Sequence, residues 1–159
     1  MQEWINQHFY LVGPLFFIGL WILVAYFIAL LSGWRLLAKR FRMQGTFPGQ
    51  KWHMQNARML LTNYGNSLTV GADETGLFVV PFILFRAWHP ALFIPWTEIT
   101  AQNKTALIFF KFVELRLGSS ESVPFKISAG LAAKLQAAAG PAWPTAYSRA
   151  MQAPPPPIA

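Results

Sequence analysis

The longest apolar run extends from Phe9 to Leu31 and contains 23 residues without a charge. A helix rises about 1.5 Å per residue, so this run predicts a helix of roughly 34 Å, enough to cross a hydrocarbon core of about 30 Å. We therefore predict a transmembrane helix over residues 9–33, after a short outer N-terminus, residues 1–8. A cleaved signal peptide is the alternative, but its apolar region is usually about 7–15 residues and follows positive charge.

A basic segment with helical spacing follows this run. Its apolar side chains recur every three or four residues, at Trp34, Leu37, Ala38 and Phe41. Basic side chains lie between them, which favours a helix with one apolar face. We predict that residues 34–43 continue the span helix along the lipid headgroups as an interfacial extension. The glycines and proline of residues 44–50 then predict a linker.

From Lys51 onward the apolar runs become short and are bounded by turn signals, a pattern typical of antiparallel strands. Gly65-Asn66 and "DETG", residues 73–76, are two of these signals. Residues 110–117, "FKFVELRL", alternate in a way that favours a strand, and the "GSSE" that follows predicts a hairpin loop. Several strands at this spacing predict an antiparallel β-sandwich or barrel.

The stretch "LFRAWHPALFIPWTEI", residues 84–99, is very apolar, yet it is too short and too interrupted to span a membrane. We interpret it as two strands, "ILFRAW" and "ALFIPW", joined around "AWHP". "ALFIPW" should enter the core, and "WTEI" should follow as an edge or turn. Pro95 is expected at a sheet edge, where the missing N–H costs no ladder hydrogen bond.

The last predicted element is a helix that begins after Ser128, a residue type that caps helix N-termini well. Leu131 and Leu135 lie one turn apart, alanine fills most other positions, and Gly140-Pro141 ends the helix. We expect this helix to close an open end of the sheet. The remaining residues, 141–159, are rich in proline and alanine and predict a disordered tail.

The charge of the chain orients the predicted span. The formal net charge is +7, from 13 basic and 6 acidic residues, and basic residues follow the span closely. Because cytoplasmic flanks of membrane spans collect Lys and Arg, the C-terminal part is expected in the cytoplasm and the N-terminus outside. Trp4, Tyr10 and Trp34 suit the aromatic belts at the two membrane interfaces.

Two sets of residues are candidate contact sites. No acidic residue occurs between Trp4 and Ala72, and the basic residues within that stretch predict contacts to anionic lipid. These candidates are Arg35, Lys39, Arg40, Arg42, Lys51 and Arg58. The alternative is that they serve only to orient the span. Ala25, Ala29 and Gly33 form a small-residue series that would let a second helix, from another copy or a partner, approach closely, unless it faces only lipid.

The chain resembles the pleckstrin-homology-like (PH-like) fold, in particular bacterial PH-like and GRAM-like domains attached to membrane spans. The stretch "IPWTEI", Ile94 to Ile99, carries most of the likeness, together with "GLFVV", which begins at Gly76, and the closing helix. The resemblance covers residues 51–140. It implies a PH-like β domain that is anchored to the bacterial inner membrane and lies in the cytoplasm. Lipid-binding members use a basic motif between their first two strands. The corresponding stretch here, residues 63–67, contains no basic residue.

Few residues suggest catalysis. The chain has no cysteine, and its three histidines, His8, His53 and His89, do not form a metal-binding spacing. His89, before Pro90, is more typical of a structural turn. The adjacent carboxylates Asp73-Glu74 fall in a turn signal, and no nucleotide-binding motif is present. We therefore expect no enzyme activity, cofactor or metal. The many aromatic residues suit a core and membrane belts better than nucleic-acid binding.

These observations lead to two functional hypotheses. The first is a non-enzymatic, single-span membrane protein whose cytoplasmic domain is a scaffold or accessory subunit of a membrane complex. Its partner would be another membrane protein, or a second copy bound through the span. The second is an anionic-lipid sensor that uses the basic segment after the span. An enzyme of unknown type would need a convergent polar pocket in the sheet domain.

Overall fold

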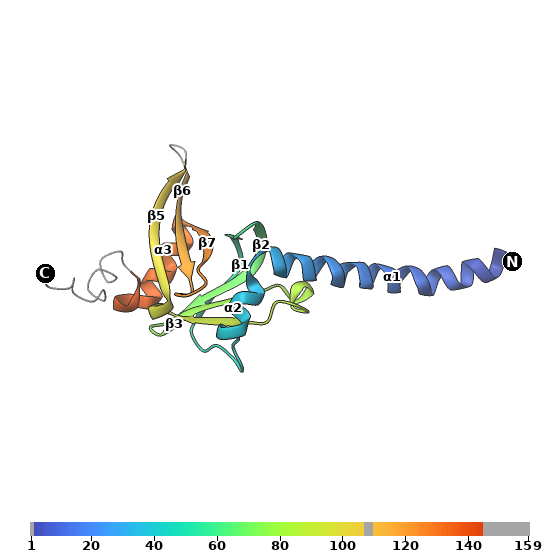
Figure 1. Ribbon diagram of the computed structural model, residues 1–159, viewed down its shortest axis with the longest axis horizontal. Helices are drawn as coiled ribbons and strands as arrows, with labels where there is room; N and C mark the ends of the chain where they lie inside the picture. The colour runs from blue at the N-terminus through green and yellow to red at the C-terminus, as the bar shows by residue number, and fades with distance from the viewer. Residues whose placement is uncertain (1, 107–109, 145–159) are drawn as a thin grey trace, which may run out of the picture.

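A long helix leads into a β-sheet domain in this protein (Figure 1). The computed structural model describes the backbone of residues 2–106 and 110–144, and the side chains of residues 12–102 and 112–144. Most of the predicted tail, residues 141–159, therefore lies outside the described residues. So do the side chains of Trp4 and Tyr10, which we expect in the aromatic belts.

The long helix, α1, covers Gln2–Leu31 and confirms the helix expected over the uncharged run. It begins earlier than predicted and includes most of the segment that we assigned to the outer N-terminus. Its part from Val12 to Leu31 is long and apolar enough to cross a membrane, although a signal sequence would have the same properties. Most apolar side chains on this part, such as Phe16 and Phe17, are exposed to solvent.

The helix does not continue into the basic segment, which corrects our prediction. Gly33 has a φ of +72°, in the left-handed region, and separates α1 from a second helix, α2, Trp34–Phe41. A Cβ at this position would also lie only 3.1 Å from the Val123 side chain. The apolar face of α2 packs into the core of the β domain, where Trp34, Leu37 and Phe41 are buried. The spacing identified the apolar face correctly, but this face contacts protein and not headgroups.

The sheet domain contains seven antiparallel strands in the order β4-β3-β2-β1-β7-β6-β5. The strands are β1 Gln50–Met59, β2 Thr62–Ala72, β3 Gly76–Pro81, β4 Leu92–Pro95, β5 Ile99–Ala106, β6 Phe110–Leu117 and β7 Val123–Ser128. The edge strands β4 and β5 are connected by one short turn, Trp96–Glu98, so the sheet is nearly closed. This confirms an antiparallel barrel-like sheet.

The C-terminal helix, α3, covers Ala129–Ala139 and confirms the predicted closing helix. The Ser128 hydroxyl accepts a hydrogen bond from the Leu131 N–H at 3.2 Å, as expected of an N-cap. Leu131 and Leu135 are buried in the main core, against the face of the sheet formed by β2, β6 and β7. The helix ends where Gly140 takes a φ of +55°.

Gly65-Asn66 is not a turn between strands, which corrects our interpretation of this pair. The chain turns earlier, at Leu60-Leu61, and Gly65 and Asn66 lie inside β2. The pairing of β1 with β2 shifts register between Gln55 and Ala57, because β2 carries extra residues at this point. Asn66 adopts a φ of +47° there. The turn-forming residues are thus used for a β-bulge.

The predicted strand "ILFRAW" is also wrong. Ile83–Phe85 forms one turn of 3₁₀ helix, and residues 86–91 form a loop that leads into β4. The N–H groups of Phe85 and Arg86 bond to carbonyls within this same segment, so they are not available to a sheet. "ALFIPW" does enter the core, with Leu92, Ile94 and Trp96 buried, and Pro95 lies on the edge strand β4, as expected.

Candidate functional site

A basic pocket lies between α2, the start of β1, β3 and the loop that precedes β4. Its volume is about 700 Å³, and no carboxylate lines it. Its basic lining side chains are Arg35, Lys39, Arg42, Lys51 and Arg86. None of the five has an ion-pair partner among the described residues, so their charge is available to an anion.

The helical spacing of α2 brings three of these cations together. Arg35 and Lys39 are four residues apart, and Arg42 follows three residues later, at the end of the helix. Residues with this spacing project on one side of a helix. Arg35 is also held by Tyr26 of α1, because its guanidinium donates a hydrogen bond of 3.0 Å to the Tyr26 hydroxyl. The pocket therefore begins at the junction of α1 with the β domain.

Aromatic rings form the wall beside Lys51. Phe47, from the segment between α2 and β1, stacks in parallel on Phe78 of β3, with ring centroids 4.8 Å apart. The Lys51 ammonium lies 5.9 Å from the first ring centroid and 5.8 Å from the second. Contacts of this kind hold a cation over an aromatic face without neutralising it. The two rings thus position the Lys51 ammonium at the wall of the pocket.

A buried histidine fixes the loop that supplies Arg86. His89 is fully buried, and its Nδ1 lies 2.9 Å from the Phe85 carbonyl oxygen, which can only accept. Nδ1 must therefore carry the proton, and Nε2 accepts from the Tyr64 hydroxyl at 3.0 Å. Burial raises the pKa of Tyr64 to about 12, so this hydroxyl stays protonated. The indole N–H of Trp34 donates to the Pro90 carbonyl at 2.9 Å, which ties the same loop to α2.

The buried histidine predicts a dependence of stability on pH. Burial lowers the pKa of His89 from 6.5, and the cations Arg35 and Arg86 line the same pocket. The unfolded chain then binds more protons than the folded chain. The contribution of His89 to the free energy of unfolding is therefore fully present above pH 6.5 and is lost as the pH decreases below it. For one group the slope is at most about 1.4 kcal/mol per pH unit. Thermal unfolding of the full chain in detergent between pH 7.5 and 5 measures this loss.

The control for this prediction is the exposed His53. We expect His89→Gln to remove the loss between pH 7.5 and 5, and His53→Gln to keep it. Asp73 and Glu98 also have lowered pKa values, Asp73 because its carboxylate accepts hydrogen bonds from Thr75 and Gly76, and Glu98 because it accepts hydrogen bonds from Ser119. They titrate at more acidic pH, outside this window. An unchanged slope in His89→Gln would contradict the assignment to His89.

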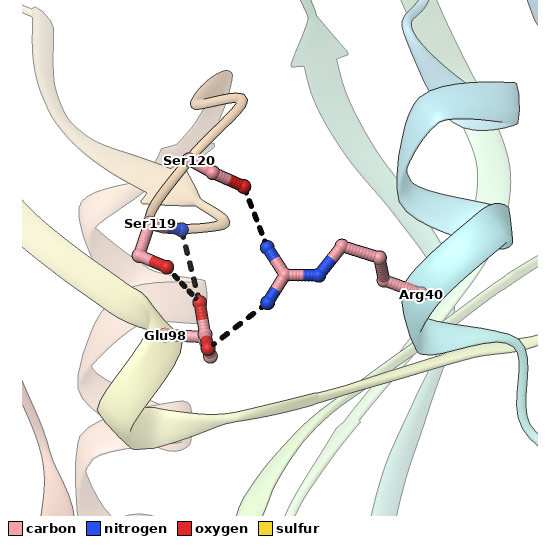
Figure 2. A network of polar contacts seen from close by, with 4 residues as sticks. All are labelled: Arg40, Glu98, Ser119 and Ser120. Atoms are coloured by element: carbon pink, nitrogen blue, oxygen red, sulfur yellow. Dashed lines mark hydrogen bonds and ion pairs between the residues drawn. The ribbon is translucent and has the colours of Figure 1, made fainter.

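Two of the predicted anionic-lipid contacts lie elsewhere. Arg40 does not line the pocket, and its side chain points toward the loop between β6 and β7 (Figure 2). Its guanidinium donates to the Ser120 hydroxyl at 2.7 Å and lies 3.4 Å from the Glu98 carboxylate, which also accepts from Ser119. Arg58 lines a smaller hollow on β1, β6 and β7, beside Glu114 and two basic residues. The structure thus separates Arg40 and Arg58 from the other four.

Arg86 was missed by the sequence analysis. It lies 44 residues after Arg42 and 35 residues after Lys51, and it joins the other cations only because the loop folds back over α2. No local pattern could have indicated this. The separation of Lys39 from Arg40, in contrast, follows from the rotation of about 100° between neighbouring helical residues and was available from the spacing.

The predicted helix-packing residues are covered by this chain itself. Ala25 and Ala29 are 1% and 0% exposed, and Gly33 lies against Val123 and Leu60. Neighbouring helix residues such as Phe27 and Leu30 are exposed. The small side chains therefore let α1 approach its own β domain, and this face is not open to a second helix.

Outside the pocket, the Asp73 carboxylate has a structural role. Asp73 caps the turn into β3, and its carboxylate accepts from the Thr75 and Gly76 N–H groups. No group of three or more potential metal ligands lies together within residues 12–102 and 112–144. No protein-family model, curated protein or solved structure matches the chain.

Proposed function

We propose that this is a membrane-anchored protein whose β domain binds the phosphate-bearing headgroup of an anionic lipid in the basic pocket. The observation that carries the proposal is the pocket itself, in which five cations from three segments of the chain surround a space without a carboxylate. Clusters of basic side chains next to a span attract anionic lipids at about 1 kcal/mol per Lys or Arg.

The membrane location rests on α1. We propose that α1 is a retained span and that the β domain lies on the cytoplasmic side of a bacterial inner membrane, since basic residues follow the helix at once. The exposed apolar side chains of α1 support a span, because in water they would lack any covering. The order of strands followed by a closing helix supports a PH-like assignment, which stays a prediction.

The proposal is tested by native mass spectrometry of the full chain in mild detergent, titrated with phosphatidylglycerol or phosphatidylcholine. We expect the anionic lipid to be retained at least fivefold more, and the preference to fall with salt, because exposed charge contacts are screened over about 8–10 Å. A parallel titration with glycerol 3-phosphate, which is soluble, distinguishes a lipid headgroup from a free phosphate. An intact mass near 17.9 kDa would show that α1 is retained and not cleaved.

Lys39 and Arg40 provide a matched pair of variants on one helix. Lys39→Gln removes a cation from the pocket and should weaken phosphatidylglycerol binding about fivefold, which corresponds to about 1 kcal/mol. Arg40→Gln removes the same charge outside the pocket and should leave binding close to that of the wild type. Equal retention of the two lipids, or equal losses in both variants, would contradict a headgroup site in this pocket.

The scaffold hypothesis stays a prediction, as does the absence of enzyme activity. One observation that supported the scaffold hypothesis no longer does so, because the small-residue face of α1 is covered by the β domain. A partner or second copy would have to use another face of α1 or of the sheet. Crosslinking in the native membrane tests this directly.

A further inference from the structure

The loop before β4 carries a cluster of exposed apolar side chains, of which only Trp88 also lines the pocket. Phe82, Ile83, Leu84 and Trp88 are all exposed, Ile83 to 65%. Single exposed apolar residues are common on proteins, but a contiguous group of large ones marks an interaction surface.

This cluster lies alongside α1 (Figure 1). The Trp21 indole N–H donates to the Leu84 carbonyl at 3.0 Å, and the Trp21 ring lies 5.4 Å from that of Phe85. Tyr26 packs edge-on against Trp88, also at 5.4 Å. The exposed side chains of the loop therefore continue the apolar surface of α1, and any medium that surrounds this part of the helix also surrounds the loop.

The length of α1 places the loop at membrane depth. Its 30 residues correspond to about 45 Å, and about 20 residues suffice for the hydrocarbon core. Trp21 precedes Leu31 by ten residues, or about 15 Å, so the loop reaches well back along the helix. Tyr26, five residues after Trp21, contacts both Trp88 and Arg35, and such aromatic and basic side chains are typical of the headgroup region.

Part of the loop backbone is satisfied within the protein. The N–H groups of Phe82, Phe85, Arg86 and His89 all donate to backbone carbonyls, at 2.7–3.3 Å. Because the bilayer offers no hydrogen-bond partners, a segment that enters it must satisfy its polar groups internally. The 3₁₀ turn at Ile83–Phe85 contributes to this.

We propose that residues 82–88 are a second membrane contact, in which Phe82, Ile83, Leu84 and Trp88 insert into the same leaflet as the C-terminal part of α1. The occupant of this surface is the lipid bilayer, not a protein partner. This inference rests on the proposed membrane location. It deepens that function, because Arg86 to Ala91 also line the basic pocket, whose mouth is thereby held at headgroup level.

The absence of cysteine allows a direct test with single labels on the full chain. Ile83→Cys, Phe17→Cys and Ala133→Cys are each labelled with an environment-sensitive fluorophore and reconstituted in bilayers of phosphatidylcholine and phosphatidylglycerol. Phe17 reports α1, and Ala133 lies exposed on α3, on the far side of the domain from α1. All three positions are exposed, so the labels should not disturb folding.

We expect the label at position 83 to be quenched at least twofold more by lipids with a shallow nitroxide than the label at position 133, and less by aqueous iodide. Quenching at position 17 without quenching at position 83 would overturn the second contact and leave the membrane anchor intact. If position 17 is also reached by iodide and not by nitroxide lipids, α1 is not in the bilayer, and the proposed function fails together with this inference.

Discussion

Replacing Trp34 by alanine is expected to lower the free energy of unfolding of the β domain by about 3–5 kcal/mol. The indole is fully buried, lies 5.1 Å from the His89 ring and 5.9 Å from the Tyr64 ring, and donates to the Pro90 carbonyl. Its removal leaves a cavity and a buried carbonyl without this donor, and both effects destabilise. Urea unfolding of the full chain in mild detergent, followed by near-ultraviolet circular dichroism, measures the change.

Leu36→Ala is the matched control, since Leu36 is on the same helix but is 41% exposed. We expect this variant to remain within about 0.5 kcal/mol of the wild type. Equal stability of the two variants would mean that α2 lies along the headgroups, as the sequence suggested, and not in the core. The comparison therefore distinguishes the predicted interfacial helix from the observed one.

Removing three pocket cations together is expected to weaken phosphatidylglycerol binding by about 100-fold. Lys39→Gln, Arg42→Gln and Arg86→Gln each remove about 1 kcal/mol of attraction, or about 3 kcal/mol in total. All three side chains are exposed, so folding should be preserved. Binding is measured by the same lipid titration as for the single variants.

The control triple variant removes the same net charge outside the pocket, through Arg40→Gln, Arg58→Gln and Lys134→Gln. We expect its affinity to fall by less than about fivefold, because screened charges at a distance contribute little. Comparable losses in both triple variants would mean that only the overall charge of the domain attracts the lipid. Unchanged binding in the pocket variant would exclude the pocket as the site.

Elements governed by local physics were predictable from the sequence. The uncharged run gave α1, Ser128 and Gly140 bounded α3, and the alternation of residues 110–117 gave a strand. In each case the deciding interactions involve residues close in sequence, such as the hydrogen bond from the Leu131 N–H to Ser128. Pro95 on the edge strand follows from its missing N–H in the same way.

The elements that were wrong depend on contacts distant in sequence. The apolar residues in 83–88 suggested a strand, because a strand in a sheet core and a loop packed along α1 both carry apolar side chains. The hydrogen bond from Trp21 of α1 to the Leu84 carbonyl shows that the loop is the correct alternative. Gly65-Asn66 would serve a hairpin or a bulge equally well, and the pairing with β1 decides. Trp34 suits both a membrane belt and a core, and the hydrogen bond from its indole N–H to the Pro90 carbonyl places it in the core.

The candidate site was predicted only in part, again because some of its contacts join residues distant in sequence. The cations of α2 are close in sequence and were found together, whereas Arg86 enters through the fold of a distant loop. The covering of Ala25 and Ala29 was not foreseeable, because a small residue indicates close approach without naming the neighbour.

The pairing of β1 with β7 sets the order in which the domain can be completed. β1 to β4 pair consecutively, as do β5 to β7, and the two groups meet through only three residue pairs, from Ala57 with Ile127 to Met59 with Phe125. Ile127 is synthesised seventy residues after Ala57, which takes about 4–14 s at elongation rates of about 5–20 residues per second. During this time one edge of β1 has no partner strand, and a membrane-inserted α1 would hold the nascent domain at the bilayer while it waits, away from other nascent chains with which an open edge could pair.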